Sequence, residues 1–127
     1  MTPSVSAVLF AKDARAVARF YVEVFGANTL AEDEHHAALD VRGFHLVVHR
    51  IPEPWAKDIE IRKPPVRREI GAIRLDYRVD DLAEARNAAK RLGGQIDDAP
   101  PAWAGPESRF FLGFDPEGNV FGVKEGR

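Results

Sequence analysis

Two histidines, an arginine and an aspartate on apolar, strand-like runs are the side chains best suited to chemistry in this sequence. His45 and His49 share one such run, and Arg74 and Asp76 share another. An arginine can donate two parallel hydrogen bonds to a carboxylate or phosphate, and a histidine or aspartate can act as a general base. Four residues along a strand span roughly 13 Å, so His45 and His49 cannot chelate one ion together. Each residue also has a structural interpretation, either as a surface histidine or as a member of an arginine–aspartate ion pair.

Alternation along the neighbouring strands adds further side chains to the same face of the predicted sheet. These further residues are Arg109, Phe111, Gly122 and Lys124. Phe110 is expected on the opposite, helix-covered face. Trp103 lies in a loop, where it could be a lid over an apolar ligand or a packing anchor. Basic side chains outnumber acidic ones on this face, which favours an anionic or carboxylate-bearing ligand.

Two amphipathic helices and a series of strands must position these side chains. Apolar residues recur at helical spacing in the run at 14–26, after a capping Asp13, and in the run at 82–94, after Asp81. Strands are predicted at 4–10, 27–31, 35–41, 44–50, 72–79, 95–100, 108–114 and 119–125. Between the halves, residues 51–69 hold four prolines and are read as a connector with one helical turn at 55–59.

The same scheme of elements occurs twice. Each half has a helix bounded by aspartate and glycine, and a later Asp-x-x-Gly turn before its last strand. The matching pairs are Asp13–Gly26 with Asp81–Gly94, and Asp40–Gly43 with Asp115–Gly118. We therefore predict an α+β fold of paired βαβββ modules, forming a curved mixed sheet with a concave groove and helices on the outer face. The first module covers about 4–50 and the second about 70–127, within a single domain of residues 1–127.

This order, together with the segments "RFYVEVFG", "LAEARNAAKRLGG" and "FDPEGNVFGVKE", resembles the vicinal oxygen chelate superfamily. That group includes glyoxalase I, bleomycin-resistance proteins, fosfomycin-resistance proteins and extradiol dioxygenases. The resemblance covers nearly the whole chain and implies a fold, but the fold hosts many chemistries.

The resemblance also implies where a metal would be held. Its ligands come seven residues before each helix-capping aspartate and seven after each turn aspartate, which gives Ser6, Val47, Arg74 and Gly122. A valine and a glycine offer no donor atom, and a guanidinium stays protonated. We therefore predict no metal and no cofactor at these positions. A glycine inside a strand indicates a close approach, so Gly122 predicts either space for an organic ligand or a bulge.

Composition narrows the classes of function. A net charge of −2 gives no electrostatic case for nucleic acid or an anionic membrane, and the absence of cysteine excludes disulfides and thiolate chemistry. No apolar run is long enough for a membrane span and the first residues do not resemble a signal peptide, so a cytoplasmic protein is expected. The acidic and histidine-rich run "EDEHH" at 32–36 is interpreted as a charged hairpin rather than a metal site, because adjacent strand residues point in opposite directions.

Three functions remain open. The first is a metal-free protein that binds a small molecule in the groove. We expect it to be a homodimer, because modules of this family close their grooves against a second copy. The second is an enzyme of the glyoxalase, lyase, isomerase or dioxygenase type, which uses a divalent metal or a metal-free acid/base pair; no catalytic residue is assigned. The third is an interaction module with no ligand. The charged groove residues favour the first.

Overall fold

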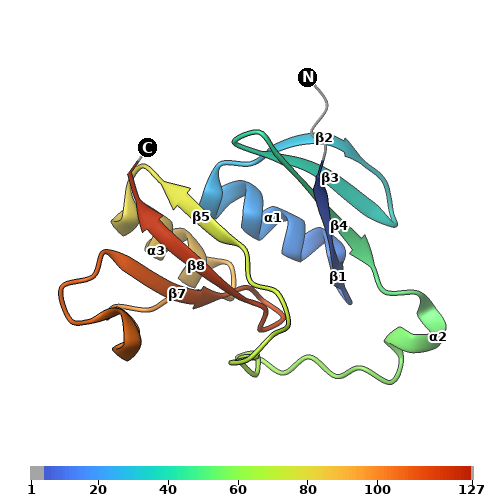
Figure 1. Cartoon of the computed structure of the whole chain (residues 1–127). Helices are drawn as coiled ribbons and strands as arrows, with labels where there is room; N and C mark the ends of the chain where they lie inside the picture. The colour runs from blue at the N-terminus through green and yellow to red at the C-terminus, as the bar shows by residue number, and fades with distance from the viewer. Residues whose placement is uncertain (1–4, 127) are drawn as a thin grey trace. The chain divides into compact units, whose positions relative to one another are not determined.

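The computed structural model describes residues 5–126, which fold into two compact units, one that ends at Ile61 and one that begins at Arg62 (Figure 1). The first position of the predicted 4–10 strand therefore lies outside the described residues. The boundary between the units falls inside the proline-rich connector, as expected for a segment that makes few regular hydrogen bonds.

The first unit is a four-stranded mixed sheet with one long helix. Its elements are β1 (Ser6–Ala11), α1 (Ala14–Phe25), β2 (Asn28–Glu32), β3 (His36–Val41), β4 (Phe44–Arg50) and the short helix α2 (Glu53–Ala56). The strand order is β1-β4-β3-β2. β1 and β4 are parallel, and the other pairs are antiparallel.

The second unit repeats this arrangement. Its elements are β5 (Asp76–Val79), α3 (Leu82–Arg91), β6 (Gln95–Ile96), the 3-10 turn η1 (Ala102–Ala104), β7 (Phe110–Phe114) and β8 (Val120–Glu125). The strand order is β5-β8-β7-β6. β5 and β8 are parallel, matching β1 and β4 of the first unit. The predicted α+β fold of two βαβββ modules is confirmed, although β5 starts four residues later than predicted and β6 keeps only two residues of the predicted 95–100 strand.

Each helix packs on one face of its own sheet. α1 buries the predicted stripe of Val17, Phe20, Tyr21, Val24 and Phe25, and it lies against β3, β4 and β1. α3 buries Leu82, Ala85 and Ala89. Burial of one such large apolar side chain stabilises the fold by about 1.5–3 kcal/mol. The opposite face of each sheet is left without a helix from its own unit.

The two helices begin in the same way, as the repeat predicts. The carboxylate of Asp13 accepts a hydrogen bond from the Ala16 N–H at 3.1 Å, and that of Asp81 accepts one from the Glu84 N–H at 3.0 Å. These bonds satisfy N–H groups that a helix leaves free in its first turn.

The repeated Asp-x-x-Gly turns share a hydrogen-bonding aspartate but differ in burial. Asp40 accepts from the Gly43 N–H at 2.9 Å in a turn open to solvent. Asp115 has no exposed surface and accepts from the N–H groups of Glu117 and Asn119 at 2.9 and 3.1 Å, and from the Asn119 side chain. Burial and the nearby Asp115 carboxylate raise the pKa of Tyr77.

Replacement of these two aspartates is expected to have unequal effects. Asp115→Ala leaves buried N–H groups without an acceptor and should lower the free energy of unfolding by about 3 kcal/mol. Asp40→Ala should cost less than about 1 kcal/mol, because water can replace the lost acceptor. Chemical denaturation of both variants measures the difference, and equal losses would contradict the assignment of Asp115 as a buried organiser of the β7–β8 turn.

The end of the predicted connector is fastened to the second unit. Arg67 donates from Nη1 and Nη2 to the two carboxylate oxygens of Asp97, at 2.7 Å each. Partial burial opposes ionisation of Asp97, but the hydrogen bonds from Arg67 and Gln95 prevail and lower its pKa. The Arg68 N–H donates to the carbonyl oxygen of Gly118 at 2.9 Å. Gly118 has φ +85° and no room for a Cβ, so only glycine fits at this contact.

The ion pair between Arg67 and Asp97 should make stability depend on pH at the acid end. Because the pKa of Asp97 is lower in the folded state, its contribution is complete above the unfolded value of about 3.9 and is lost as the pH falls through the folded value. The difference in free energy of unfolding between wild type and Asp97→Asn should therefore be constant from pH 7 to about pH 4.5 and shrink below about pH 4.

Asp98→Asn is the matched control, since the Asp98 side chain is fully exposed and lies 3.8 Å from Arg86. Urea denaturation at a series of pH values provides the measurement. If the wild type and Asp97→Asn differ by the same amount at pH 3 as at pH 7, the ion pair does not contribute as described.

Candidate ligand-binding site

Arg74 and Asp76 form a forked ion pair on the open face of the second sheet. Arg74 Nε donates to Asp76 Oδ1 at 2.7 Å, and Nη2 donates to Oδ2 at 3.2 Å. The hydrogen bond with Asp76 raises the pKa of Arg74, although some desolvation opposes this. The two side chains are 40% and 49% exposed. The pair is thus held in one geometry while its outer edge remains open to solvent.

Two aromatic rings hold the Arg74 guanidinium from the side. Its Cζ lies 5.1 Å from the ring centroid of Phe110 and 5.8 Å from that of Trp103, within the range of cation–π attraction. The Trp103 and Phe110 rings lie 5.6 Å apart. Trp103 is 68% exposed, so one ring face is available beside the arginine. The structure therefore brings the predicted residues Arg74, Asp76 and Trp103 together.

Phe110 belongs to this cluster although the alternation along the sequence predicts it on the helix side. In the β7–β8 register, Phe110 pairs with Lys124 and Leu112 pairs with Gly122. Directly opposite residues of an antiparallel pair share one face, so Phe110 lies on the open face together with Gly122 and Lys124.

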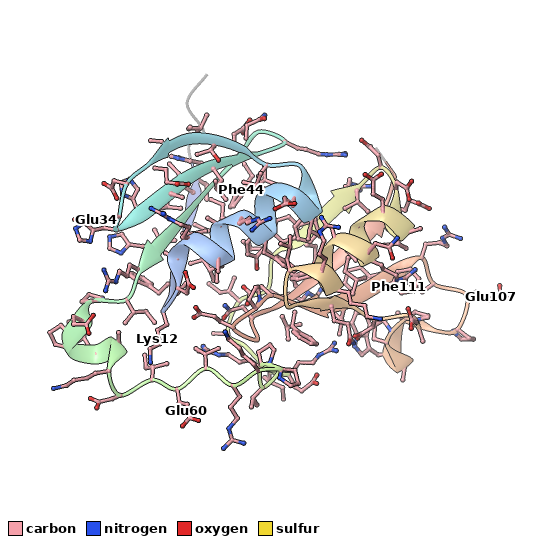
Figure 2. All side chains as sticks on the ribbon, turned by 180° about the vertical axis from the view of Figure 1, so that it is seen from behind. Lys12, Glu34, Phe44, Glu60, Glu107 and Phe111 are labelled. Carbon is pink, nitrogen blue, oxygen red and sulfur yellow. The ribbon has the colours of Figure 1, made fainter. Side chains whose placement is uncertain are left out.

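The same register corrects the predictions for Phe111 and Arg109, which were expected to face the ligand. Phe111, labelled in Figure 2, is buried. Its ring centroid lies 4.5 Å from the guanidinium carbon of Arg86 in α3. Arg109 pairs with Glu125 at 2.9 Å, and the other oxygen of Glu125 accepts from the Leu82 N–H at the start of α3. Both side chains are thus tied to the helix-covered side.

Gly122 lies in a regular ladder, directly between Asp76 of β5 and Leu112 of β7, and not in a bulge. The prediction that Gly122 leaves space for an organic ligand is also wrong, because neighbouring side chains fill this space. A Cβ at this position would come within 2.5 and 2.6 Å of the Phe110 ring atoms and would collide with Asp76 Oδ1. The missing side chain is what allows the Phe110 ring and the Asp76 carboxylate to lie where they do.

Basic groups predominate around the cluster. Lys124 follows Gly122 on the same face, is exposed, and pairs in register with Arg78 of β5. Lys124 makes no ion pair with any of residues 5–126. Lys124 therefore adds a positive charge to the face that carries the ion pair of Arg74 and Asp76.

His45 and His49 lie on β4 of the first unit, on the face opposite α1. His45 pairs in register with Ser6, and its Nε2 is buried without a hydrogen-bond partner among the described residues. His49 Nδ1 lies 2.7 Å from the Arg50 carbonyl oxygen, and its ring centroid is 5.7 Å from that of Phe10. The two histidines therefore have different surroundings on one strand.

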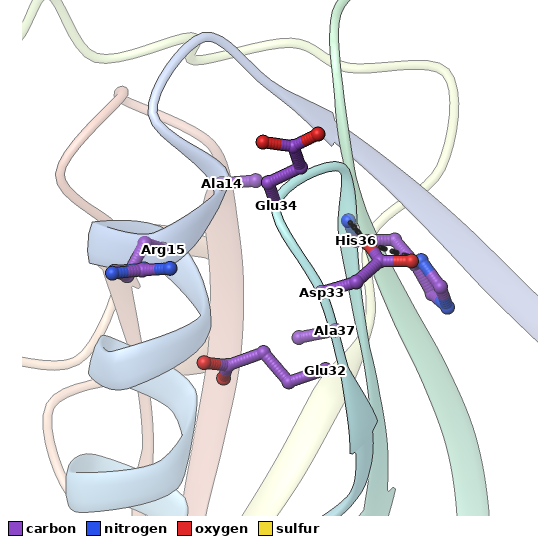
Figure 3. Close-up of a pocket in the computed structure, with 7 residues that line it drawn as sticks. All are labelled: Ala14, Arg15, Glu32, Asp33, Glu34, His36 and Ala37. Atoms are coloured by element: carbon purple, nitrogen blue, oxygen red, sulfur yellow. Dashed lines mark hydrogen bonds and ion pairs between the residues drawn. The ribbon is translucent and has the colours of Figure 1, made fainter.

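The run at 32–36 forms the tight turn between β2 and β3 that the sequence predicts. Asp33 Oδ1 accepts from the N–H groups of His35 and His36 at 2.8 and 2.9 Å, and these bonds lower the pKa of Asp33. A small hollow beside this turn is lined by seven residues, Ala14, Arg15, Glu32, Asp33, Glu34, His36 and Ala37 (Figure 3). Within residues 5–126, no three histidine, aspartate or glutamate side chains lie close enough to hold a metal ion.

The residues at the metal positions implied by the resemblance do not fit a divalent ion. Arg74 is a cation bound to Asp76, and the Cβ position of Gly122 is occupied by its neighbours. In the first unit, Val47 pairs in register with Val8, and neither has a donor atom. Only the Ser6 hydroxyl remains, so no part of the function is derived through a metal at these positions.

The sequence matches the family model of the glyoxalase-like domain over residues 6–124, so the chain belongs to this family. A search of curated proteins gave no sequence match. Within residues 5–126, no helix has both the length and the apolar character needed to cross a membrane.

Solved structures with a similar fold include fosfomycin resistance proteins. FosX from Listeria monocytogenes, complexed with Mn(II) and sulfate, is 15% identical with a TM-score of 0.68, covering 100% of this chain and 92% of that one. FosX from Mesorhizobium loti is 12% identical with a TM-score of 0.67, covering 100% and 94%. The hypothetical protein SA1046 from S. aureus is 16% identical with a TM-score of 0.64, covering 97% and 93%. FosX proteins belong to the vicinal oxygen chelate superfamily, and the predicted resemblance is confirmed.

Gly122→Ala should disturb the cluster and the fold together. The added methyl group must displace the Phe110 ring or the Asp76 carboxylate, which should lower the free energy of unfolding by about 1–3 kcal/mol. Gly71→Ala is the control, because a Cβ there meets only an ordinary contact at 3.5 Å. Denaturant unfolding, followed by the combined fluorescence of Trp55 and Trp103, measures the change in stability. An unchanged stability in Gly122→Ala would contradict the close packing at this position.

Proposed function

We propose that the protein binds a small anionic molecule, of the carboxylate or phosphate class, on the open face of the second sheet without using a metal ion. Arg74 is the residue that carries this proposal. A guanidinium has five N–H donors, and Asp76 occupies two of them. The three others have no hydrogen-bond partner among residues 5–126, so they can receive an anion at no cost in broken protein bonds.

Preorganisation supports the same conclusion. Asp76 and the rings of Phe110 and Trp103 restrict the arginine before any ligand arrives. A side chain that is already ordered loses less conformational entropy on binding. The exposed Trp103 ring and the positive charge of Lys124 suit a ligand with a flat or apolar portion next to its anionic group.

Binding is preferred to acid/base catalysis because of how the polar groups are engaged. Both oxygens of the Asp76 carboxylate already accept hydrogen bonds from Arg74. The FosX structures, whose descriptions include Mn(II) with sulfate and with 1S,2S-dihydroxypropylphosphonic acid, show that proteins of this fold accept small anions.

We extend the proposal to the predicted groove and homodimer. Small-molecule sites bury most of their ligand, and an open sheet face needs a second surface to do so. Exposed apolar side chains at the start of the second unit, Ile70 and Ile73, are 96% and 83% exposed, which supports a contact with a second copy of the chain. A cytoplasmic location is proposed on the composition alone.

Benzoate and benzamide provide a direct test, because they have the same shape and differ in charge. We expect millimolar benzoate to raise the melting temperature of wild-type protein, with or without EDTA, and benzamide to have little effect. Arg74→Gln should weaken benzoate binding by roughly 10- to 100-fold, the value of one or two charge-assisted hydrogen bonds. Isothermal titration calorimetry measures the affinities.

Arg109→Gln is the matched control, since it removes another exposed arginine that is paired with a carboxylate, but on the helix side. Arg74→Lys keeps the charge and loses the fork, so it should fall between wild type and Arg74→Gln. The ligand-free melting temperature shows that each variant is folded. Equal affinity for benzoate and benzamide, or unchanged benzoate binding by folded Arg74→Gln, would overturn the proposal; EDTA-sensitive binding would indicate a metal.

A further inference from the structure

His36 and His49 form a cross-strand pair on the face of the first sheet that α1 leaves open. They lie directly opposite each other in the β3–β4 register. The Arg50 N–H donates to the His35 carbonyl oxygen at 2.7 Å, which places the His36–His49 pair between the hydrogen bonds of the ladder. In such a pair the Cα atoms are only about 4.5 Å apart and the side chains come closest. The two ring centroids are 6.2 Å apart and the ring planes differ by 23°.

The hydrogen bonds of the two rings fix which nitrogen carries the proton. His36 Nδ1 lies 2.9 Å from Asp33 Oδ1, and this carboxylate oxygen already accepts from the backbone N–H groups of His35 and His36, so it acts as an acceptor toward the ring. His49 Nδ1 lies 2.7 Å from the Arg50 carbonyl oxygen, which also can only accept. Both neutral rings therefore hold a proton on Nδ1 and a lone pair on Nε2.

This arrangement is the one that metal-binding histidines adopt. Such histidines donate the second ring N–H to a carboxylate or a backbone carbonyl, which fixes the ring and makes the free nitrogen a better ligand. Here one histidine has each kind of partner. Two imidazoles that bind one ion through Nε2, at about 2.0–2.1 Å, have ring centroids roughly 4.5–6.4 Å apart. The observed separation lies within that range.

We propose that His36 and His49 bind one divalent transition-metal ion through their Nε2 atoms. Since no group of three or more potential ligands exists within residues 5–126, water completes the coordination. Two imidazoles and water select borderline ions, with Cu²⁺ bound more tightly than Ni²⁺ or Zn²⁺. The site differs from the family positions Ser6 and Val47, and its residues lie on another unit than Arg74.

Copper titration of the wild type and histidine variants tests the site. We expect wild-type protein to bind one Cu²⁺ in a saturable manner, with an electron paramagnetic resonance spectrum that shows coupling to imidazole nitrogen. His36→Gln and His49→Gln should each weaken binding by at least roughly 10-fold, and the double variant should lose little more, because one histidine alone is a poor site. Asp33→Asn should weaken binding by a smaller factor.

His35→Gln and His45→Gln are the matched controls. His35 is adjacent to His36 in the chain and pairs with Glu34 at 3.4 Å, whereas His45 lies on the same strand as His49. Both variants should bind Cu²⁺ like the wild type, and the melting temperature without metal shows that all variants are folded. Absence of saturable binding by wild type would overturn the proposal, and so would wild-type affinity for Cu²⁺ in folded His36→Gln or His49→Gln. The histidine variants should bind benzoate with the same affinity as the wild type. The proposal of anion binding at Arg74 and the proposal of metal binding at His36 and His49 can therefore fail separately.

Discussion

The parallel pairing of the first and last strands in each unit is the constraint from which the rest of the structure follows. β1 pairs with β4, and β5 pairs with β8, each in parallel register. A parallel neighbour cannot be reached by a hairpin and needs a crossover, which α1 and α3 provide. Each crossover helix covers one face of its sheet and buries the alternate apolar residues there. The remaining residues of the same strands point to the face without a helix. They are not needed for core packing, so polar and charged side chains can occupy these positions.

The open faces of the two sheets carry different side chains at equivalent backbone positions. Val8 pairs with Val47 in the first unit, and at the equivalent place in the second unit Asp76 pairs with Gly122. The glycine accommodates the Phe110 ring and the Asp76 carboxylate, and the carboxylate in turn holds Arg74. Where the resemblance implies a cation bound to protein ligands, the second unit thus has a protein cation bound to a carboxylate. In the first unit the polar groups lie elsewhere on the open face, where the His36 ring of β3 is paired with the His49 ring of β4.

Much of the fold could be predicted because its signals are local. The spacing of apolar residues in α1, the capping aspartates and the repeated Asp-x-x-Gly turns are all visible in neighbouring residues. The side of β7 was predicted wrongly because its run, "RFFLGF", is apolar at nearly every position and alternation carries no signal there. The turn at Asp115–Asn119 contains the missing information, since its closing bond from Asp115 N–H to the Asn119 carbonyl at 3.1 Å sets Phe114 opposite Val120. The filled space at Gly122 and the pairing of His36 with His49 depend on contacts between distant segments, which spacing along one strand does not reveal.

The central claim is that Arg74 is held in place in the free protein and keeps donors for an anion. Side-chain nitrogen NMR of arginine reports this directly, because a guanidinium in a forked ion pair rotates slowly and gives a resolved Nε–H signal. We expect a resolved Arg74 signal that is lost in Arg74→Lys, and that shifts in a saturable way with benzoate but not with benzamide. An Arg74 signal averaged like those of solvent-exposed arginines, or one unmoved by benzoate, would contradict this claim.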